Sequence, residues 1–333
     1  MTDIHPILRR YGQDCQPTRA EPLGSAGGLS GAQFWRLATP RCTLLLRRWP
    51  VEHPTPDRLR FIHAVLRHAA DRGIDFLPVP IATADGATLV SHAGHRWELA
   101  PWLPGVADYD RSPRAEKLHA AMAALAEFHK AVADFQTSPP LASLLRPAPA
   151  ITTRLPRLRE LELGGADALA QAITDSHWPE LAPLARQFLA ALPRAVPQAI
   201  RQLVPLADVK FPLQPCVRDV WHDHVLFDGD CVTGLVDFGA MQIDTPATDV
   251  ARLLGSLVSD NEIGWRAGVA AYTSVRPLSE QELAAVTALD ASGTILAAAN
   301  WIRWIYLDGR RFDNRKKIAA RFKRLTDRIR QQC

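Results

Sequence analysis

The chain has 333 residues, of which 47% are hydrophobic and 22% charged, and its formal net charge is +4 at pH 7. This composition is typical of a folded globular protein and excludes an intrinsically disordered one. Only the run 310–330 approaches the basic face that nucleic-acid binding requires, and a solvated helix accounts for it, so no nucleic-acid partner is expected. A chain of this length exceeds one ordinary hydrophobic core, which predicts two lobes.

Cysteine usage and apolar content favour a cytoplasmic protein. The five cysteines contain no CxxC pair, so neither a disulfide framework nor a structural zinc site is predicted. Residues 1–12 carry no apolar segment of signal-peptide length, and no stretch approaches the roughly 18 apolar residues of a membrane span. We therefore expect no membrane partner. The oligomeric state is left open.

The first hundred residues have a strand-rich pattern that surrounds one helix. Residues 57–72 carry Leu, Ile and Ala at helical spacing and follow two prolines, which predicts a helix there. Strands are predicted where short apolar runs lie between turn signals, at 33–37, 43–47, 87–90 and 96–99.

The segment 101–105, Pro-Trp-Leu-Pro-Gly, interrupts this pattern and is predicted to be a hinge or linker. It would separate an N-lobe, residues 1–100, from a C-lobe, residues 106–333. Beyond it the apolar spacing is mostly helical, and one hairpin near residues 219–238 is the single strand-like segment expected in this half. Helices are predicted at 113–135, in several pieces within 157–204, and at 278–307 and 315–330.

Two acidic residues, Asp219 and Asp237, flank this predicted hairpin. If its turn is centred on Gly229, His224 faces Gly234 and both acids lie at the open end of the ribbon. Phosphoryl transfer needs one carboxylate to orient a hydroxyl and another to hold the metal that neutralises the nucleotide phosphates. The pair therefore predicts Asp219 as the catalytic base and Asp237 as a metal ligand, whereas capping of a turn or strand end is the structural alternative for each.

The segment 216–254 resembles the aminoglycoside phosphotransferase and choline kinase family, small-molecule relatives of the protein kinases. Asp219 matches the family's catalytic acid, Asp237-Phe238-Gly239 its metal-binding triplet, and the run 244–249 the tail of its signature, in which Asp249 is expected to brace the catalytic loop. The resemblance implies an α+β, bilobal, protein-kinase-like fold with a small antiparallel-sheet N-lobe and a large, mainly helical C-lobe. It also implies transfer of the γ-phosphoryl group of ATP to a hydroxyl of a small molecule, with Mg²⁺, or Mn²⁺, as the metal cofactor.

Three positions depart from the family pattern. Val217 and Arg218 replace the usual His and Gly, and His224 stands where an Asn metal ligand is expected. Because imidazole is a softer ligand than an amide oxygen, three hypotheses stay open: His224 is a second metal ligand with altered metal preference, it acts indirectly through water or phosphate, or one metal site has been lost. The last motivates the main alternative function, a pseudokinase that binds nucleotide or a partner without transfer.

Two other enzyme classes are disfavoured. His222 and His224 together would suit a zinc hydrolase, but no third ligand supports that reading. No Ala-Pro-Glu segment follows the triplet at residue 239, which argues against a protein kinase.

Nucleotide-binding residues are predicted in the N-lobe. Arg47 matches the strand lysine of the family and is expected to contact the phosphates. Helix 57–72 offers no obvious acidic partner for this cation, because it holds aspartates only at its ends and His63 in the middle. Glu98 and Ala100 precede the linker and resemble the segment that recognises adenine through backbone groups. A glycine-rich loop over the phosphates is predicted from Gly27, Gly28, Ser30 and Gly31, since glycine lets backbone N–H groups approach an anion.

The acceptor would be bound by the helices of the C-lobe. Trp301 and Trp304 suggest an aromatic cage for a quaternary ammonium group. They share a helix face, however, which favours core packing. No acidic cluster marks a pocket for a polycationic aminoglycoside.

Overall fold

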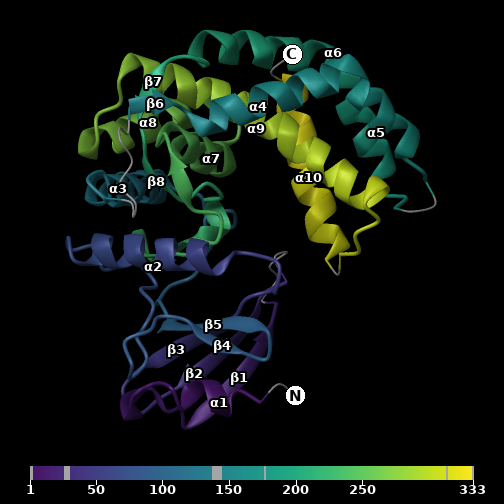
Figure 1. Cartoon of the computed structure of the whole chain (residues 1–333). Coiled ribbons are helices and arrows are strands. Elements are labelled where there is room, and N and C mark those ends of the chain that lie inside the picture. The colour runs from purple at the N-terminus through teal and green to yellow at the C-terminus, as the bar shows by residue number, and fades with distance from the viewer. Residues whose placement is uncertain (1–2, 26–30, 137–144, 176–177, 313, 332–333) are drawn as a thin grey trace. The chain divides into compact units, whose positions relative to one another are not determined.

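The computed structural model describes residues 3–25, 31–136, 145–175, 178–312 and 314–331. The chain divides into two compact units that interleave in sequence (Figure 1). Unit 1 comprises residues 1–140 and 219–241, and unit 2 comprises residues 141–218 and 242–333. The chain therefore passes from one unit to the other immediately before Asp219.

Unit 1 contains a five-stranded antiparallel sheet with the strand order β1-β2-β3-β5-β4 (Figure 1). The predicted strands at 33–37, 43–47 and 96–99 are confirmed, whereas the one predicted at 87–90 begins only at Val90. The first strand was not predicted, because its largely exposed residues give little hydrophobic alternation. The strands are β1 (Arg19–Gly24), β2 (Gln33–Ala38), β3 (Thr43–Arg48), β4 (Val90–His92) and β5 (His95–Pro101).

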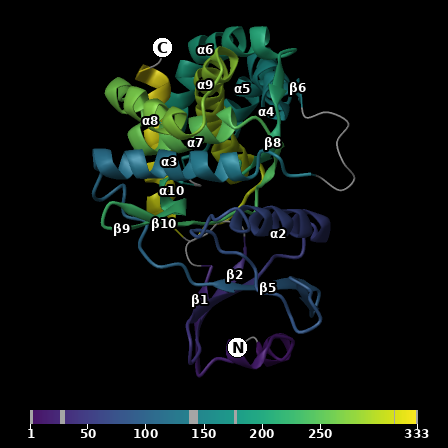
Figure 2. The ribbon, with the colours of Figure 1, turned by 90° about the vertical axis from the view of Figure 1, so that its left-hand side faces the viewer.

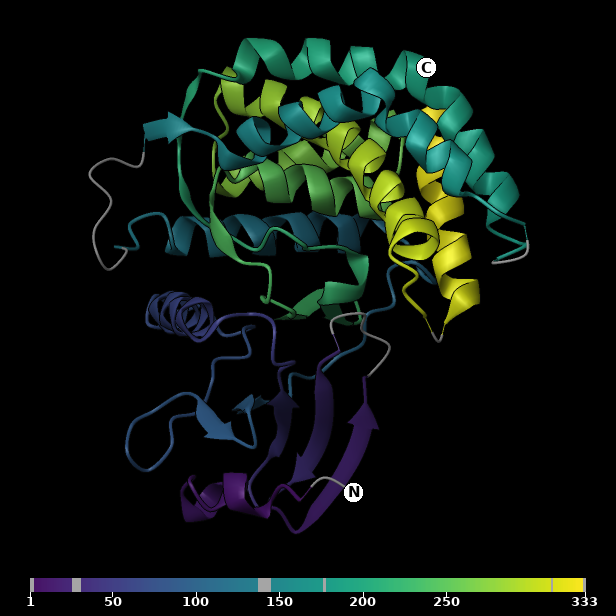
Figure 3. The same cartoon turned by 45° about the vertical axis from the view of Figure 1, so that its right-hand side comes forward.

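The two faces of this sheet are covered by different helices, which lie on opposite sides of it in Figures 2 and 3. Leu44 and Leu46 of β3 belong to a buried cluster with residues of α1 (His5–Leu8). Successive strand residues point to opposite faces, so Leu45 and Arg47 lie on the other face. There they line a cavity together with His63 of α2 (Pro56–Ala70), the helix predicted at 57–72.

Unit 1 also contains α3 (Ala115–Ala131) and a hairpin of β9 (Val225–Asp228) and β10 (Cys231–Leu235). The predicted register of this hairpin is wrong. Cys231 pairs with Asp228 around a two-residue turn, and a bulge between Val232 and Gly234 shifts the later pairs. The backbone N–H of Val236, not that of Gly234, consequently donates to the carbonyl of His224 (3.0 Å).

Unit 2 is mainly helical. Its central helix, α9, packs against α4, α6, α7 and α10, and Figure 3 shows these helices gathered in one layered bundle. The helix after α7 was not predicted. In chain order the helices are α4 (Pro149–Glu160), α5 (Ala166–Ala172), α6 (Ala182–Leu203), α7 (Ala247–Val258), α8 (Glu262–Val275), α9 (Glu280–Ile302) and α10 (Arg315–Gln331).

Two short ladders in unit 2 correct the expectation that the hairpin is the single strand-like segment after the linker. β6 (Leu145–Pro147) pairs with β7 (Lys210–Pro212), and β8 (Gln214–Cys216) pairs with β11 (Gln242–Asp244). Strands of three residues are too short to give a periodic signal in sequence. The β8–β11 ladder brings together the two segments that flank the hairpin, so it fixes where the chain enters and leaves it.

The segment Glu280–Leu307, which contains α9, is long and apolar enough to cross a membrane by length and composition. This differs from the expectation that no stretch approaches that length. In the fold, however, 61% of its most apolar window is buried inside the protein, and four helices pack around α9. It is a core helix of an α+β fold with a small antiparallel sheet and a large helical part, which is the predicted fold class.

Candidate functional site

Asp249 holds the loop that leads into Asp219. Its two carboxylate oxygens accept the backbone N–H groups of Val217 (2.6 Å) and Arg218 (2.7 Å). Asp249 is fully buried in the first turn of α7. Arg218 has a left-handed backbone with φ 71°, a conformation that non-glycine residues rarely adopt. The contacts match the bracing that was expected of Asp249.

His224 links the two acids of the predicted site. The indole Nε1–H of Trp221 donates to Nε2 of His224 (2.7 Å), and Nδ1 of His224 lies 2.8 Å from the backbone carbonyl of Asp219. Because an indole N–H only donates and a carbonyl only accepts, the ring is the neutral tautomer with its proton on Nδ1. Nε2 also lies 3.6 Å from Oδ2 of Asp237. The backbone of Asp219 and the carboxylate of Asp237 therefore lie beside the two nitrogens of one imidazole ring.

Asp237 is held in an unusual conformation at the end of the hairpin. Its backbone is left-handed, with φ 65°, and its side chain is 49% exposed. Phe238 is buried, with its ring centroid 5.7 Å from that of Phe128 on α3, and so anchors the triplet. At Gly239 a Cβ atom would lie 3.2 Å from the Trp49 ring, so a larger residue would displace this side chain. The result is an accessible hard carboxylate of the kind divalent cations prefer.

Arg47 has an acidic partner that sequence analysis did not identify. Glu98 lies directly opposite Arg47 in the β3–β5 register, and Nη1 of Arg47 is 3.6 Å from its carboxylate. His63 of α2 places Nε2 at 2.8 Å from Oε2 of Glu98 and Nδ1 at 2.8 Å from the hydroxyl of Thr88. Burial alone would raise the pKa of Glu98, but the hydrogen bond from His63 and the charge of Arg47 together lower it. The acidic partner of Arg47 thus comes from strand β5 and not from helix α2, and α2 contributes the histidine that holds this acid.

The surroundings of Arg47 suit an oxyanion. Its guanidinium lies 4.5 Å from the centroid of the Trp49 ring and 4.9 Å from that of Phe34. Its Nε is buried and has no hydrogen-bond partner among the described residues, a costly arrangement for an N–H donor. The cavity lined by Arg47 and Glu98 is also lined by Asp237 and Gly239. The predicted phosphate-binding cation and the predicted metal ligand therefore face one cavity within unit 1.

The other predicted nucleotide-binding residues are placed less fully. Gly27, Gly28 and Ser30 lie outside the described residues. Gly31 resumes the described chain with φ 78°, and a Cβ there would lie 3.8 Å from Pro50. Ala100 is buried near the end of β5 and lines the same cavity as Arg47. Their nucleotide contacts stay predictions.

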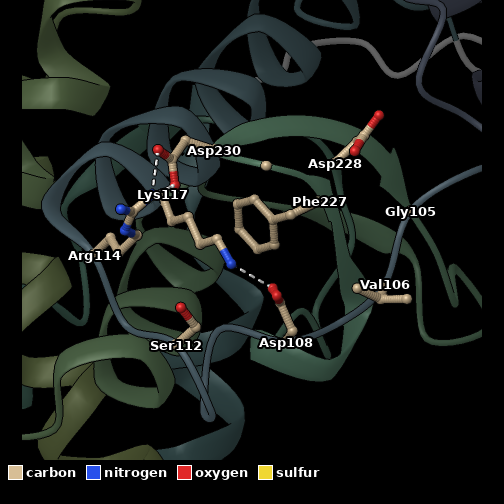
Figure 4. Close-up of a pocket in the computed structure, with 10 residues that line it drawn as sticks. Gly105, Val106, Asp108, Ser112, Arg114, Lys117, Phe227, Asp228 and Asp230 are labelled. Carbon is tan, nitrogen blue, oxygen red and sulfur yellow. Dashed lines mark hydrogen bonds and ion pairs between the residues drawn. The ribbon is translucent and has the colours of Figure 1, made fainter.

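A separate pocket of about 520 Å³ lies at the turn end of the hairpin (Figure 4). Nζ of Lys117 donates to Asp108 (2.6 Å), and the guanidinium of Arg114 donates to both carboxylate oxygens of Asp230 (3.0 and 2.8 Å). Each of these cations is thus neutralised by a carboxylate within the pocket. The pocket is at the far end of β9 and β10 from Asp237, and it has no part in the transfer chemistry considered below.

Comparison with known sequences identifies one family. The sequence matches the profile of the Phosphotransferase enzyme family over residues 23–286. It is 29% identical over 244 residues to a homoserine kinase of Brucella anthropi, an alignment that covers 72% of this chain and 66% of that relative. It is 30% identical over 274 residues to a homoserine kinase of Afipia carboxidovorans, which covers 80% of this chain and 74% of that relative.

Solved structures with a similar fold are kinases of small molecules. A spectinomycin phosphotransferase in complex with ADP and spectinomycin has a TM-score of 0.68 at 11% identity, with 93% of this chain and 92% of that chain covered. An amicoumacin kinase solved with AMP-PNP and Ca²⁺ has a TM-score of 0.66 at 13% identity, with 99% and 96% covered. At these identities the likeness establishes the kinase-like fold.

Proposed function

The chain belongs to the phosphotransferase enzyme family, and from this premise we propose that it transfers the γ-phosphoryl group of ATP to a hydroxyl of a small molecule. It is a small-molecule kinase. The relatives named above are homoserine kinases, and homoserine is an amino acid with a hydroxyl group. The pseudokinase alternative is not favoured. This alternative was motivated by His224, by Val217 and by the lack of an acidic partner for Arg47 in helix 57–72. Glu98 supplies that acid from a strand.

ATP is proposed to bind in unit 1 with its phosphates against Arg47. The buried, unpartnered Nε of Arg47 supports this role, because a phosphate oxygen would satisfy that donor. Two solved structures of similar fold contain ADP or AMP-PNP, which supports nucleotide binding by this chain. The glycine-rich residues Gly27, Gly28, Ser30 and Gly31, together with Glu98 and Ala100, are proposed as the remaining nucleotide contacts.

A divalent cation, Mg²⁺ or Mn²⁺, would neutralise the phosphate charge, and Asp237 is the residue proposed to hold it. Asp237 fits this role because its carboxylate is hard, anionic and half exposed. His224 fits direct coordination poorly, since its Nε2 lone pair already accepts the indole N–H of Trp221. We propose that His224 instead positions the backbone of Asp219 through Nδ1.

Asp219 is proposed to accept the hydrogen bond of the acceptor hydroxyl and to take its proton as the new bond to phosphorus forms. Its carboxylate is exposed, and the preceding peptide is fixed by Asp249. Homoserine is the first acceptor to test, because the curated relatives are homoserine kinases. A cytoplasmic enzyme without nucleic-acid or membrane partners is proposed.

The observation that supports this function is that His224 lies between the backbone of Asp219 and the carboxylate of Asp237, each beside one of its ring nitrogens. The test is ADP formation by the purified chain with ATP, Mg²⁺ or Mn²⁺, and a panel of hydroxylated acceptors that includes L-homoserine. We expect ADP to form in proportion to one class of acceptor. ADP formation that is independent of every acceptor, or absent with both metals, would contradict the proposal.

A further inference from the structure

Glu98 lies between two partners, His63 of α2 and Arg47 of β3. Nε2 of His63 is 2.8 Å from Oε2 of Glu98, which is hydrogen-bond distance. Nη1 of Arg47 is 3.6 Å from Oε1 of Glu98, which is close enough for an ion pair but too long for a hydrogen bond. The three side chains are between 4% and 14% exposed, and all belong to unit 1. Glu98 is therefore hydrogen-bonded to the histidine and only attracted to the arginine.

Thr88 holds the His63 ring in this orientation. Its hydroxyl lies 2.8 Å from Nδ1 of His63. Because an ionised carboxylate only accepts hydrogen bonds, Nε2 of His63 is the donor to Glu98, and Nδ1 of the neutral ring accepts from Thr88. Burial raises the pKa of Glu98, and the hydrogen bond from His63 lowers it more than the charge of Arg47 does. His63 is thus the stronger partner of Glu98.

Aromatic side chains, not Glu98, hold the guanidinium of Arg47. It lies over the rings of Trp49 and Phe34, 4.5 and 4.9 Å from their centroids, and such cation–π contacts fix its position without using its N–H donors. Its Nε has no hydrogen-bond partner among the described residues. Arg47 also lines a cavity of about 30 Å³, which has room for about one water-sized oxygen atom. The arginine is therefore positioned, and its Nε donor is available to an oxygen of a ligand.

We propose that His63 is a positioning residue that keeps the carboxylate of Glu98 away from Arg47, so that the arginine binds the nucleotide phosphates. A buried carboxylate without the His63 donor would turn to the nearest cation, and the guanidinium fork of Arg47 matches it. A phosphate group would then have to displace Glu98 from those N–H donors. The inference rests on the proposed function, in which Arg47 contacts the phosphates, and it assigns control of that contact to a residue of another element, α2.

The first test compares two replacements of His63 that differ by one methylene group. Glutamine can place an amide N–H near the position of Nε2 and so keep the donor to Glu98, whereas asparagine reaches only the position of Nδ1. We expect His63→Asn to weaken the binding of ATP and of inorganic tripolyphosphate about tenfold to a hundredfold, the range of one charge-assisted hydrogen bond. His63→Gln should bind both ligands nearly as tightly as wild type. Calorimetry with Mg²⁺ and without acceptor measures these affinities.

A second test removes the charge of Glu98. If His63 acts by restraining this charge, Glu98→Gln should bind tripolyphosphate more tightly than wild type, and the double variant His63→Asn/Glu98→Gln should recover the affinity that His63→Asn loses. If Glu98 instead braces Arg47 for phosphate binding, Glu98→Gln should bind tripolyphosphate more weakly and the double variant should show no recovery. Weaker binding by Glu98→Gln would overturn the proposal, and this result does not depend on whether His63→Asn folds.

His68→Asn is the matched control, because His68 lies on the same helix and its Nε2 contacts another carboxylate, that of Asp134 (3.0 Å). It should leave the affinity for ATP and for tripolyphosphate unchanged. Adenosine, which lacks phosphates, should bind equally to His63→Asn and to wild type. An equal loss of adenosine and tripolyphosphate affinity in His63→Asn would assign His63 a structural role and overturn the proposal. A loss of tripolyphosphate affinity in His68→Asn as large as that in His63→Asn would do the same.

Transfer assays separate this proposal from the proposed function. His63→Asn should raise the KM for ATP and leave the KM for the acceptor unchanged. If tripolyphosphate binding follows these predictions but no acceptor is phosphorylated, the proposed function fails and the role of His63 stands. If phosphate is transferred but His63→Asn binds ATP as tightly as wild type, the role of His63 alone fails. A wild-type chain that binds neither ATP nor tripolyphosphate would overturn both.

Discussion

The two ring nitrogens of His224 decide what this residue can do. Nε2 accepts the indole N–H of Trp221 and Nδ1 donates to the Asp219 carbonyl, so a bond from Nε2 to a metal requires the Trp221 hydrogen bond to break. The sequence left three hypotheses for His224 open because it does not reveal which partners its nitrogens have. The observed contacts favour an indirect role through the Asp219 backbone.

Trp221→Phe tests this assignment. Phenylalanine keeps an aromatic ring but lacks the indole N–H. The Nε2 lone pair of His224 then becomes able to bind a metal. Since imidazole prefers Mn²⁺ over Mg²⁺ more than an oxygen ligand does, we expect Mn²⁺ affinity in the presence of ATP to rise relative to Mg²⁺ affinity. The dissociation constants of both metals, measured by titration with wild type as the control, check the result. An unchanged ratio, combined with weaker Mn²⁺ binding in His224→Ala, would instead make His224 a ligand already in the wild type.

At the scale of elements, strands and helices with a strong periodic pattern were predictable. Strands β2 and β3 and helices α2, α3, α9 and α10 were located from sequence to within a few residues. The three-residue ladders and the hairpin register were not, because a bulge and a tight turn depend on which residues pair across strands. The partner of Arg47 was missed for the same reason. Glu98 became its partner through the β3–β5 register, 51 positions later in the chain.

Glu98 of β5 contacts Arg47 of β3 and His63 of α2. These contacts make the free energy of unfolding depend on pH. The folded-state pKa of Glu98 is lowered from its usual value near 4.5. Below that usual value the unfolded chain takes up a proton that the folded chain does not, so stability present at neutral pH is lost as pH falls through the folded pKa. Glu98→Gln should flatten this acid dependence and cost about 3 kcal/mol at pH 7, the scale for breaking a buried charged pair.

Urea unfolding from pH 7 to pH 3 measures the effect of Glu98→Gln. Glu127→Gln, at an exposed position of α3, serves as the control and should follow the wild-type curve. If the slope of stability against pH is the same in Glu98→Gln as in wild type, Glu98 is not the group that titrates.

At the scale of the whole molecule, the two interleaved units determine which part of the chain carries the proposed nucleotide-binding and catalytic residues. Arg47, Asp219 and Asp237 all belong to unit 1, although that unit is assembled from residues 1–140 and 219–241. The motif in segment 216–254 was enough to predict the fold class and the family.

Stabilisation of the folded chain by ligands tests the proposed roles of Arg47 in ATP binding and of Asp237 in metal binding. ATP at about 100 times its dissociation constant should stabilise the folded chain by about 2.7 kcal/mol. Asp237→Asn should remove the part of the shift that depends on Mg²⁺ or Mn²⁺ and keep the part that ATP alone produces through Arg47. Thermal unfolding with and without each metal measures both parts, and Asp228→Asn, at the exposed end of β9, is the control. A metal-dependent shift that survives in Asp237→Asn would place the metal on other residues.

The fate of the γ-phosphoryl group tests the central proposal most directly. Phosphorus NMR of ATP, metal and acceptor should show the γ resonance replaced by one phosphomonoester for each ADP formed, and Asp219→Asn should slow this exchange by about a hundredfold or more. The affinity of Asp219→Asn for ATP should equal that of wild type. Release of inorganic phosphate in place of a phosphomonoester, or an undiminished rate in Asp219→Asn, would contradict the account.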